Sequence, residues 1–437
     1  MARDVQSVPA ADDAAPVARD RLPGGAVPWA VAVASVLVAG VVAVVARPLA
    51  PDLGAVPDAT PWFDATLLRR IAAYQQPLRR AGVIGTAIEL VVPVAIAVTL
   101  WGRGLVARVV GVVGATRASR AAAAVAVVVV VVTAVARLPV DLWAYRHARA
   151  FGLSTQSVAG WAGDRAIEVS VMALGAALVL AVGYALARRW PRHWVLAAVP
   201  LGALAVAATT LAAPLVLEPL RYDTTPLPDG PVRRALTDVL EADPGTDAAL
   251  LVADASRRTT RQNAYVSGLA GTRRIVLFDT LLERRPAEIA LIVAHELAHE
   301  RNHDVLRGVL AGSAGLAALC LLVELVVRRR IRRGLQRERS DPYAAAVVVA
   351  VIVVAMLAAS PVVAWASRRV EAAADLGALQ LTGAYGEYCA VQRGLVERNL
   401  TDPAPPTWAR LWWWSHPPAT SRLELASRLG GDDACRP

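Results

Sequence analysis

Seven long apolar runs constrain the fold of this chain more than any other feature of its sequence. They lie at about residues 29–46, 83–101, 121–136, 167–187, 194–217, 305–327 and 343–366. Most of them approach the roughly 17–25 residues that an α-helix needs to cross a bilayer. The chain has 437 residues, of which 56% are hydrophobic, and its mean hydropathy is +0.45. This is too apolar for a soluble protein of this length, so we expect a multi-pass integral membrane protein.

The charged residues also indicate a membrane rather than nucleic acid. The net charge is +10, and every basic residue is an arginine. These arginines gather at the ends of the apolar runs, most densely at 328–340, where they suit anionic lipid headgroups and a cytoplasmic loop. We therefore predict the lipid bilayer as a partner and no nucleic acid.

The chain divides into five parts by composition. The membrane part holds five of the runs, and we read 138–166 within it as a polar connecting loop. A polar segment follows, then the last two runs with their Arg-rich loop, and a final segment. The expected boundaries are 1–27 for a flexible tail, 28–217, 218–303, 304–366 and 367–437.

The polar segment 218–303 has strand-like and helical patterns. Three runs rich in Val, Ile, Leu and Tyr predict strands at Ala249–Ala253, Asn263–Ser267 and Arg274–Phe278, the last two forming a hairpin. Pro286 is suited to the first turn of a helix. We expect that helix to continue past His299 and straight into the sixth run.

The predicted helix contains the pattern H-E-x-x-H. His295 and His299 are four residues apart, so on a helix both rings lie on one face and reach one metal ion. Glu296 between them is placed to act on a water as general base. With only 6 histidines in the chain, a chance match is uncommon. The alternative is a helix end that carries two solvated histidines.

A catalytic zinc needs a third protein ligand. Glu371 follows the seventh run, and two crossings return it to the side of His299. Asp375 shares its helix face and would hold a ligand histidine through the free ring N–H. Taken alone, this pair is better explained as a solvated helix face balanced by Arg368 and Arg369, whereas behind H-E-x-x-H we favour the ligand interpretation. His303 is a weaker candidate for a fourth ligand, and His147 reads as structural.

The three cysteines give no sign of a disulfide framework or of a metal site. They are Cys320, Cys389 and Cys435, far apart in the sequence.

These motifs resemble the integral-membrane zinc metallopeptidases of the CAAX prenyl endoprotease type, in the gluzincin group. The resemblance rests on H-E-x-x-H together with several segments that match the family pattern. These are Phe151–Gln156, Asn263–Tyr265, Arg274–Leu282, Glu371–Asp375 and the H-P-x-x-x-x-R segment from His416 to Arg422. The implied fold is a mainly α-helical polytopic membrane protein, with seven transmembrane helices and a small α+β zincin-like catalytic domain.

The resemblance also implies roles for these residues. His295, His299 and Glu371 would bind one Zn²⁺ ion, and Glu296 would activate water. His416 and Arg422 would stabilise the oxyanion. A substrate peptide would add to the strand edge at Asn263, Ala264 and Tyr265.

The predicted function is therefore a membrane-embedded zinc endopeptidase that cleaves membrane-associated, prenylated or misfolded proteins. The alternative is a catalytically inactive zinc-binding membrane scaffold or transporter. We expect the protein in a bacterial cell membrane. Arginine in the loops at 102–120, 188–193 and 328–340 favours an active site that faces outward, whereas the eukaryotic relatives favour the cytosolic side.

Overall fold

The structure is a computed structural model of the chain. It describes residues 53, 55–216, 218–241, 248–267, 273–431 and 434–435. The expected tail at 1–27 and the first expected span at 29–46 lie outside the described residues.

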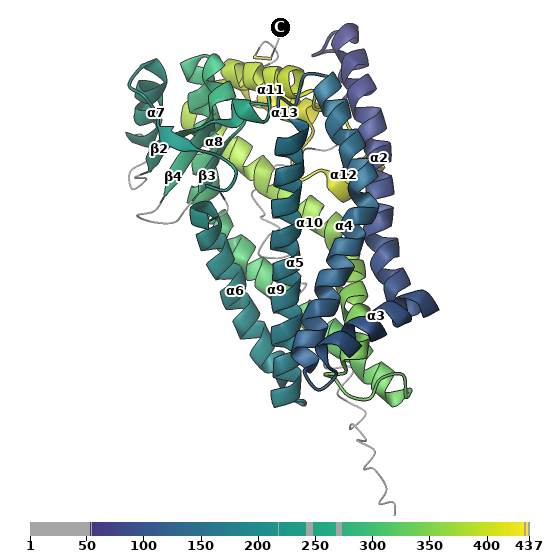
Figure 1. Ribbon diagram of the computed structural model, residues 1–437. Helices are drawn as coiled ribbons and strands as arrows, with labels where there is room; N and C mark the ends of the chain where they lie inside the picture. Colours follow the sequence, from purple (N-terminus) through teal and green to yellow (C-terminus); the bar gives the residue numbers. More distant parts are fainter. Residues whose placement is uncertain are drawn as a thin grey trace, which may run out of the picture.

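Long apolar helices form the membrane part of the molecule (Figure 1). Their bounds are α2 at Ala65–Val98, α3 at Leu100–Val113, α4 at Ala118–Ala150, α5 at Val158–Arg189, α6 at Trp194–Val216, α9 at Asp304–Arg332, η4 at Pro342–Ala344 and α10 at Ala345–Thr382. Among the described residues, five helices are long and apolar enough to cross a membrane: α2, α4, α5, α9 and α10 with η4. A sixth, α6, is apolar over the shorter stretch Trp194–Thr210. Six of the expected runs thus fall on helices, while a total of seven spans is not established.

The expectation of a connecting loop at 138–166 is wrong. Helix α4 continues to Ala150 and α5 begins at Val158, so only a short turn joins them. The polar residues stay helical because they pair with one another between α4 and α5. Asp141 lies 3.0 Å from Arg137 on its own helix and 3.0 Å from Arg165 on α5. The Ser157 hydroxyl then caps α5 by accepting the Gly160 N–H at 3.0 Å.

The short turn between α4 and α5 ties the membrane part to the polar domain. Ser154 forms an isolated antiparallel bridge with Thr259, and the Thr155 hydroxyl donates to the Ser256 carbonyl at 2.7 Å. These contacts, between residues about a hundred positions apart, fix how the polar domain sits on the helices.

The polar domain is a four-stranded sheet with helices packed on it (Figure 1). The strands are β1 at Thr224–Pro226, β2 at Ala249–Ala253, β3 at Ala264–Ser267 and β4 at Arg274–Phe278, in the order β1-β2-β4-β3. Strands β2 and β4 are parallel, and the other pairs are antiparallel. The expected β3–β4 pairing is present, and β1 is an additional strand. The helical elements are α7 at Pro231–Glu241, η1 at Ala255–Arg257, η3 at Asp279–Glu283 and α8 at Pro286–Arg301.

Helix α8 does not run straight into the sixth span, contrary to expectation. It ends at Arg301, and α9 begins at Asp304. Between them His303 has a left-handed backbone, with φ of 55°. This conformation is unfavourable for a residue with a Cβ, and it turns the chain sharply between the two helices.

The last segment folds over the same end of the molecule as the sheet (Figure 1). It contains α11 at Tyr385–Asn399, α12 at Thr407–Trp413 and α13 at Ala419–Gly430. Apolar side chains of α11 and α13 pack with the start of α2 in one cluster, which includes Tyr74, Tyr388 and Leu423. The carboxyl-terminal segment is therefore packed on the start of α2, at the same end of the molecule as the sheet.

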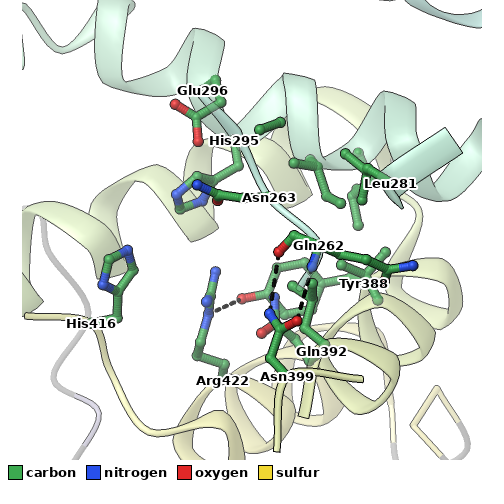
Figure 2. A pocket seen from close by; sticks show the side chains of 15 residues that line it. Gln262, Asn263, Leu281, His295, Glu296, Tyr388, Gln392, Asn399, His416 and Arg422 are labelled. Atoms are coloured by element: carbon green, nitrogen blue, oxygen red, sulfur yellow. Dashed lines mark hydrogen bonds between the residues drawn. The ribbon is translucent and has the colours of Figure 1, made fainter. Parts of the chain in front are cut away.

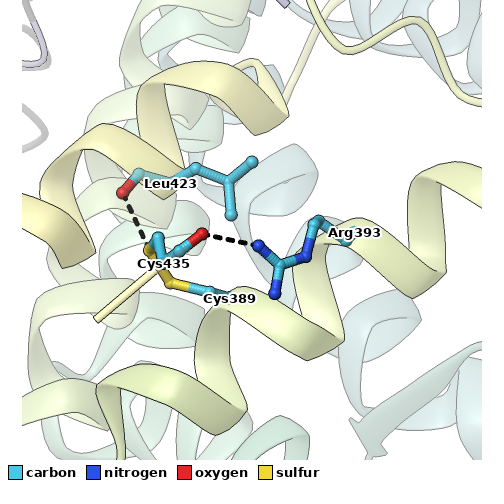
Figure 3. The surroundings of a disulfide bond; sticks show 4 residues. All are labelled: Cys389, Arg393, Leu423 and Cys435. Atoms are coloured by element: carbon cyan, nitrogen blue, oxygen red, sulfur yellow. Dashed lines mark hydrogen bonds between the residues drawn. A yellow bond between two sulfur atoms is a disulfide. The ribbon is translucent and has the colours of Figure 1, made fainter. Parts of the chain in front are cut away.

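A disulfide joins Cys389 on α11 to Cys435 near the carboxyl terminus (Figure 3). The expectation that the cysteines show no disulfide framework is thus wrong for this pair. The backbone around Cys435 is held further because its carbonyl accepts a hydrogen bond from the Arg393 guanidinium at 2.6 Å. The bond spans 46 residues of sequence, so local spacing gave no indication of it.

Candidate metal centre and active site

Helix α8 presents its histidines because another face of the helix is fixed in the core. Ile289, Val293 and Leu297 follow at intervals of four and are 0% exposed, packed in the cluster that also contains strand residues of the sheet. Full burial of each such side chain contributes about 1.5–3 kcal/mol. This packing fixes the rotation of α8, and His295 and His299 therefore stand on a different, partly exposed face.

Two ring nitrogens and one carboxylate converge beside α8. The Nε2 atoms of His295 and His299 are 3.2 Å apart. Glu371 on α10 places Oε2 3.3 Å from His295 Nε2 and Oε1 3.6 Å from His299 Nε2. Within the described residues, these are the His, Cys, Asp and Glu side chains that gather closely enough to hold a metal ion, all within 4.8 Å of one another. His303 is not among them.

Glu371 reaches the histidines because α10 crosses α8 at very short range. The crossing occurs where Gly377 meets Ala298. A Cβ built on Gly377 would lie 2.8 Å from the Cβ of Ala298, closer than real side chains approach. The absence of a side chain at Gly377 therefore sets the separation of the two helices, six residues after Glu371.

Each histidine ring has a carboxylate at its outer nitrogen. His295 Nδ1 lies 3.0 Å from Asp375 Oδ1, and His299 Nδ1 lies 3.0 Å from Asp304 Oδ2. A carboxylate in this position accepts the Nδ1 proton, which leaves the lone pair of Nε2 directed at the centre of the group. Asp375 was among the predicted residues, whereas Asp304 was missed. Its signal is weak, since an Asp five residues after a histidine becomes its neighbour only when the helix breaks between them.

The donor set fits a zinc ion. In a tetrahedral site with metal–ligand bonds of about 2.0–2.1 Å, neighbouring ligand atoms are about 3.3 Å apart. The separations of 3.2, 3.3 and 3.6 Å among the three side chains match this spacing. Two imidazoles and one carboxylate also form a ligand set known from zinc hydrolases, with a fourth position left for water or substrate.

The electrostatics of the group also favour a cation. Burial opposes the charged form of the His295 imidazole, but its hydrogen bonds to Asp375 and Glu371 outweigh this and raise its pKa to about 10. The same carboxylates that favour a positive charge on this ring would also favour a metal cation beside it. Burial raises the pKa of the Glu296 carboxyl above its ordinary value, although the nearby histidines and the Val266 N–H partly oppose the rise. A carboxylate with a raised pKa is a stronger base.

The predicted substrate strand is an edge of the sheet. Strand β3 pairs with β4 on one side only. Phe278 N–H donates to the Asn263 carbonyl at 3.0 Å, and Tyr265 lies opposite Val276. In an antiparallel pair, hydrogen-bonded residue pairs alternate with pairs that are not hydrogen-bonded. Since Asn263 is in a hydrogen-bonded pair, the N–H and carbonyl of Ala264 point away from β4 toward the open edge. Asn263 and Ala264 line a cavity together with His295 and Glu296.

The two residues of the H-P-x-x-x-x-R segment approach the site differently. His416 is 59% exposed and places Nε2 3.3 Å from Glu371 Oε2. Arg422 on α13 is mostly buried, and its guanidinium donates to Asp375 Oδ1 and, at 3.2 Å, to the Tyr388 hydroxyl. Both line the same cavity, as Figure 2 shows. Arg422 therefore also fixes the carboxylate that orients His295.

A further residue that the sequence did not single out holds the His416 segment. Arg368 on α10 donates from one guanidinium nitrogen to the carbonyls of Arg410 and Trp414, both at 2.7 Å. These bonds attach the end of α12 to the helix that carries Glu371. His147, predicted to be structural, lies away from the centre and contacts the Tyr74 carbonyl at 3.0 Å.

Comparisons with known proteins agree with this geometry. Residues 226–429 match the family model of Peptidase family M48. A Bacillus subtilis protein described as "Uncharacterized metalloprotease YhfN" is 27% identical over 297 residues, which cover 67% of this chain and 70% of that protein. The CAAX prenyl protease 1 homolog of Arabidopsis thaliana is 37% identical over 86 residues, or 19% of this chain and 20% of that protein. The crystal structure of S. mikatae Ste24p shares the fold, with a TM-score of 0.74 and 17% identity over 91% of this chain and 99% of that one.

These similarities define the class of the protein: it is a membrane zinc metallopeptidase. The chain is also similar to CAAX prenyl proteases, in sequence over a short stretch and in fold, which agrees with the resemblance inferred from the sequence. It is an integral, multi-pass membrane protein with a metal cofactor and with peptide or protein substrates. The comparisons do not favour the alternative of an inactive scaffold or transporter.

Proposed function

We propose that His295, His299 and Glu371 hold a single zinc ion, at which the protein hydrolyses peptide bonds of membrane-associated, prenylated or misfolded proteins. The observation that carries the proposal is the convergence of two imidazole Nε2 atoms and one carboxylate, with ligand atoms within 4.8 Å of one another. When bound, a zinc ion acts as a Lewis acid toward the scissile carbonyl and lowers the pKa of water.

Glu296 moves the proton in this proposal. It follows His295 directly on α8 and lines the cavity where the scissile bond would lie. Its raised pKa suits a carboxylate that takes a proton from water and delivers it to the leaving amine. Asp375 and Asp304 orient the rings of His295 and His299 through the Nδ1 protons.

The free edge of β3 binds the substrate backbone. Ala264 offers an N–H and a carbonyl on the side away from β4, which is the requirement for adding a peptide as a further strand. The neighbouring Asn263 and Tyr265 flank this position. Substrate would thus be held extended, with one bond placed beside Glu296.

His416 and Arg422 stabilise the negative charge that develops on the scissile carbonyl oxygen. Both line the cavity, and His416 lies on the exposed side of Glu371. Arg422 has a guanidinium already bound to Asp375 and Tyr388, so its contribution is a fixed positive charge rather than a mobile donor.

The test is the substitution Glu296→Gln in the full-length protein, purified in detergent. The variant keeps the ligand residues, so we expect it to bind one zinc ion per chain while cleavage of a quenched-fluorescent peptide is lost. A Glu296→Gln protein that binds zinc and cleaves as fast as wild type would contradict the proposal.

We further propose that the catalytic side faces an oxidising compartment outside the cytoplasm. The segments that connect the spans at 102–120, 188–193 and 328–340, partly helical in the structure, hold most of the arginine of the short connections, and such arginine-rich connections are usually cytoplasmic. The helices α2, α4, α5, α6, α9 and α10 run from these loops to the catalytic end (Figure 1). The disulfide between Cys389 and Cys435 lies at that catalytic end, and disulfides persist in oxidising compartments.

Two reporters fused after residue 437 test this orientation in a bacterial host. Alkaline phosphatase is active only outside the cytoplasm, and green fluorescent protein exported by the same route is dark. We expect an active phosphatase fusion and a dark fluorescent one. In the unfused protein, Cys389 and Cys435 should resist a maleimide after denaturation without reductant, whereas the free Cys320 on α9 reacts. The opposite reporter pattern with three reactive cysteines would place the site in the cytoplasm.

A further inference from the structure

One face of α11 forms a wall of the cavity beside the metal centre (Figure 2). Residues spaced by three or four positions on a helix share a face, and five residues of α11 that line the cavity follow this spacing. They are Tyr388, Val391, Gln392, Leu395 and Asn399. His295 and Glu296 line the same cavity, so a substrate side chain next to the scissile bond has this wall within reach.

The cavity has room for one side chain. Its volume is about 170 Å³, whereas a single water needs about 10–15 Å³. Leu281, Leu291 and Val391 among its lining residues are at most 3% exposed. These apolar side chains stand beside polar ones in the cavity wall, and the polar groups that are free to pair decide which side chains fit.

Two of the amide side chains in the cavity wall already have partners. Asn399 Oδ1 accepts the Gln262 backbone N–H at 2.9 Å, and Asn399 Nδ2 donates to the Gln262 carbonyl at 3.2 Å. The Gln262 side chain donates to the Thr280 carbonyl at 3.0 Å and accepts from Arg284 Nε at 2.6 Å. These amides shape the cavity but are not free to bind a substrate.

Gln392 differs from both. It is 5% exposed, it lines the cavity, and no described residue makes a hydrogen bond with its carboxamide. The carboxamide lines the cavity, so a substrate side chain that covers it without pairing would leave a buried polar group unsatisfied, which is costly. A substrate side chain with its own donor and acceptor would satisfy both ends of this carboxamide.

We infer that Gln392 determines specificity, and that the cavity selects a substrate residue at the scissile bond with an apolar stem and a neutral hydrogen-bonding end. Glutamine has both features, while leucine and norleucine lack the polar end and lysine carries a charge that the carboxamide does not neutralise. The inference rests on the proposed function, since it concerns the substrate of that same site.

The test uses peptides that differ only at the residues flanking the scissile bond. Matched pairs compare glutamine with norleucine, which has a similar shape, and threonine with valine. With the zinc-loaded full-length protein, we expect kcat/KM to be about tenfold higher for the glutamine peptide at one of the two positions, because the unmatched amide must otherwise stay unpaired.

Variants of Gln392 should change this preference in defined directions. Gln392→Met keeps the size and removes the amide, so norleucine should become the better residue. Gln392→Glu should instead favour lysine at the same position, a gain that a misfolded variant could not show. Gln380 is exposed on α10, and Gln380→Met serves as the control that leaves the wild-type ratio unchanged.

The outcomes separate this inference from the function on which it rests. Equal glutamine-to-norleucine ratios in wild type, Gln392→Met and Gln392→Glu would overturn the role of Gln392 while leaving a working peptidase. Failure of the zinc-loaded wild-type protein to cleave any peptide would contradict the proposed function, and the inference with it.

Discussion

Asp304 provides a sharp test of the metal centre because its role follows from the structure and not from any sequence motif. It starts α9, and its Oδ2 lies 3.0 Å from Nδ1 of His299. Removing a carboxylate that orients a ligand histidine typically weakens metal binding by 10–100-fold, or about 1.4–2.7 kcal/mol. The side chain of His299 is 22% exposed and that of Asp304 11% exposed. Since water partly replaces the lost acceptor, we expect Asp304→Ala to weaken zinc binding by about tenfold.

The assay is a zinc titration of the purified protein against a chelator of known affinity, followed by peptide cleavage at saturating zinc. Asp304→Asn keeps a hydrogen-bond acceptor and should weaken binding less than Asp304→Ala. Asp375 is 0% exposed, so its replacement should weaken binding more. Asp238→Ala removes an exposed helical carboxylate elsewhere and should bind zinc as the wild type does. Wild-type zinc affinity in Asp304→Ala would refute the proposed orientation of His299.

Three other predictions concern packing and metal removal. Gly377→Val should push α10 away from Ala298 and lower the free energy of unfolding by about 1–3 kcal/mol, which thermal unfolding would detect. It should also weaken zinc binding, because Glu371 moves with α10. An unchanged zinc affinity in a titration would contradict the argument that this helix crossing places Glu371. Leu297→Ala should destabilise the protein by about 2–5 kcal/mol because Leu297 is 0% exposed, and a melting temperature equal to wild type would refute its place in the core. A chelator should abolish cleavage and zinc restore it, with zinc at 100 times its Kd adding about 2.7 kcal/mol of stability; cleavage that persists after complete zinc removal would contradict the metal requirement.

The apolar runs predicted where helices lie because hydrophobicity over about twenty residues is a local property. Hydrophobicity did not predict where these helices end. The polar stretch after residue 137 was read as a loop, yet α4 continues through it because Asp141 pairs with Arg137 and Arg165. Charges that neutralise each other between neighbouring helices do not end a helix, and no single-chain hydropathy pattern contains that pairing.

The candidate site was predictable to the extent that it is local. The spacing of His295 and His299 sets a shared helix face, and the geometry of the site agrees with that expectation. Glu371 could be proposed because two membrane crossings return the chain to the same side. Asp304 could not be proposed from the sequence, since it reaches His299 only because the backbone at His303 is left-handed.

The disulfide was not predictable for a similar reason. Cys389 and Cys435 are 46 residues apart, and they meet only because α13 packs against α11 and returns the chain to it. Long-range closure of this kind depends on the tertiary fold rather than on the spacing of the cysteines.

Zinc X-ray absorption spectroscopy of the Glu296→Gln protein tests the central claim most directly, because this variant should hold the metal without turnover. We predict one zinc ion per chain, coordinated by two imidazole nitrogens at about 2.0–2.1 Å and by oxygen at about 2.0–2.2 Å. The imidazole signal should fall by half in the variant that also carries His299→Ala. A zinc ion bound by sulfur, or an unchanged spectrum after removal of His299, would contradict the proposed site.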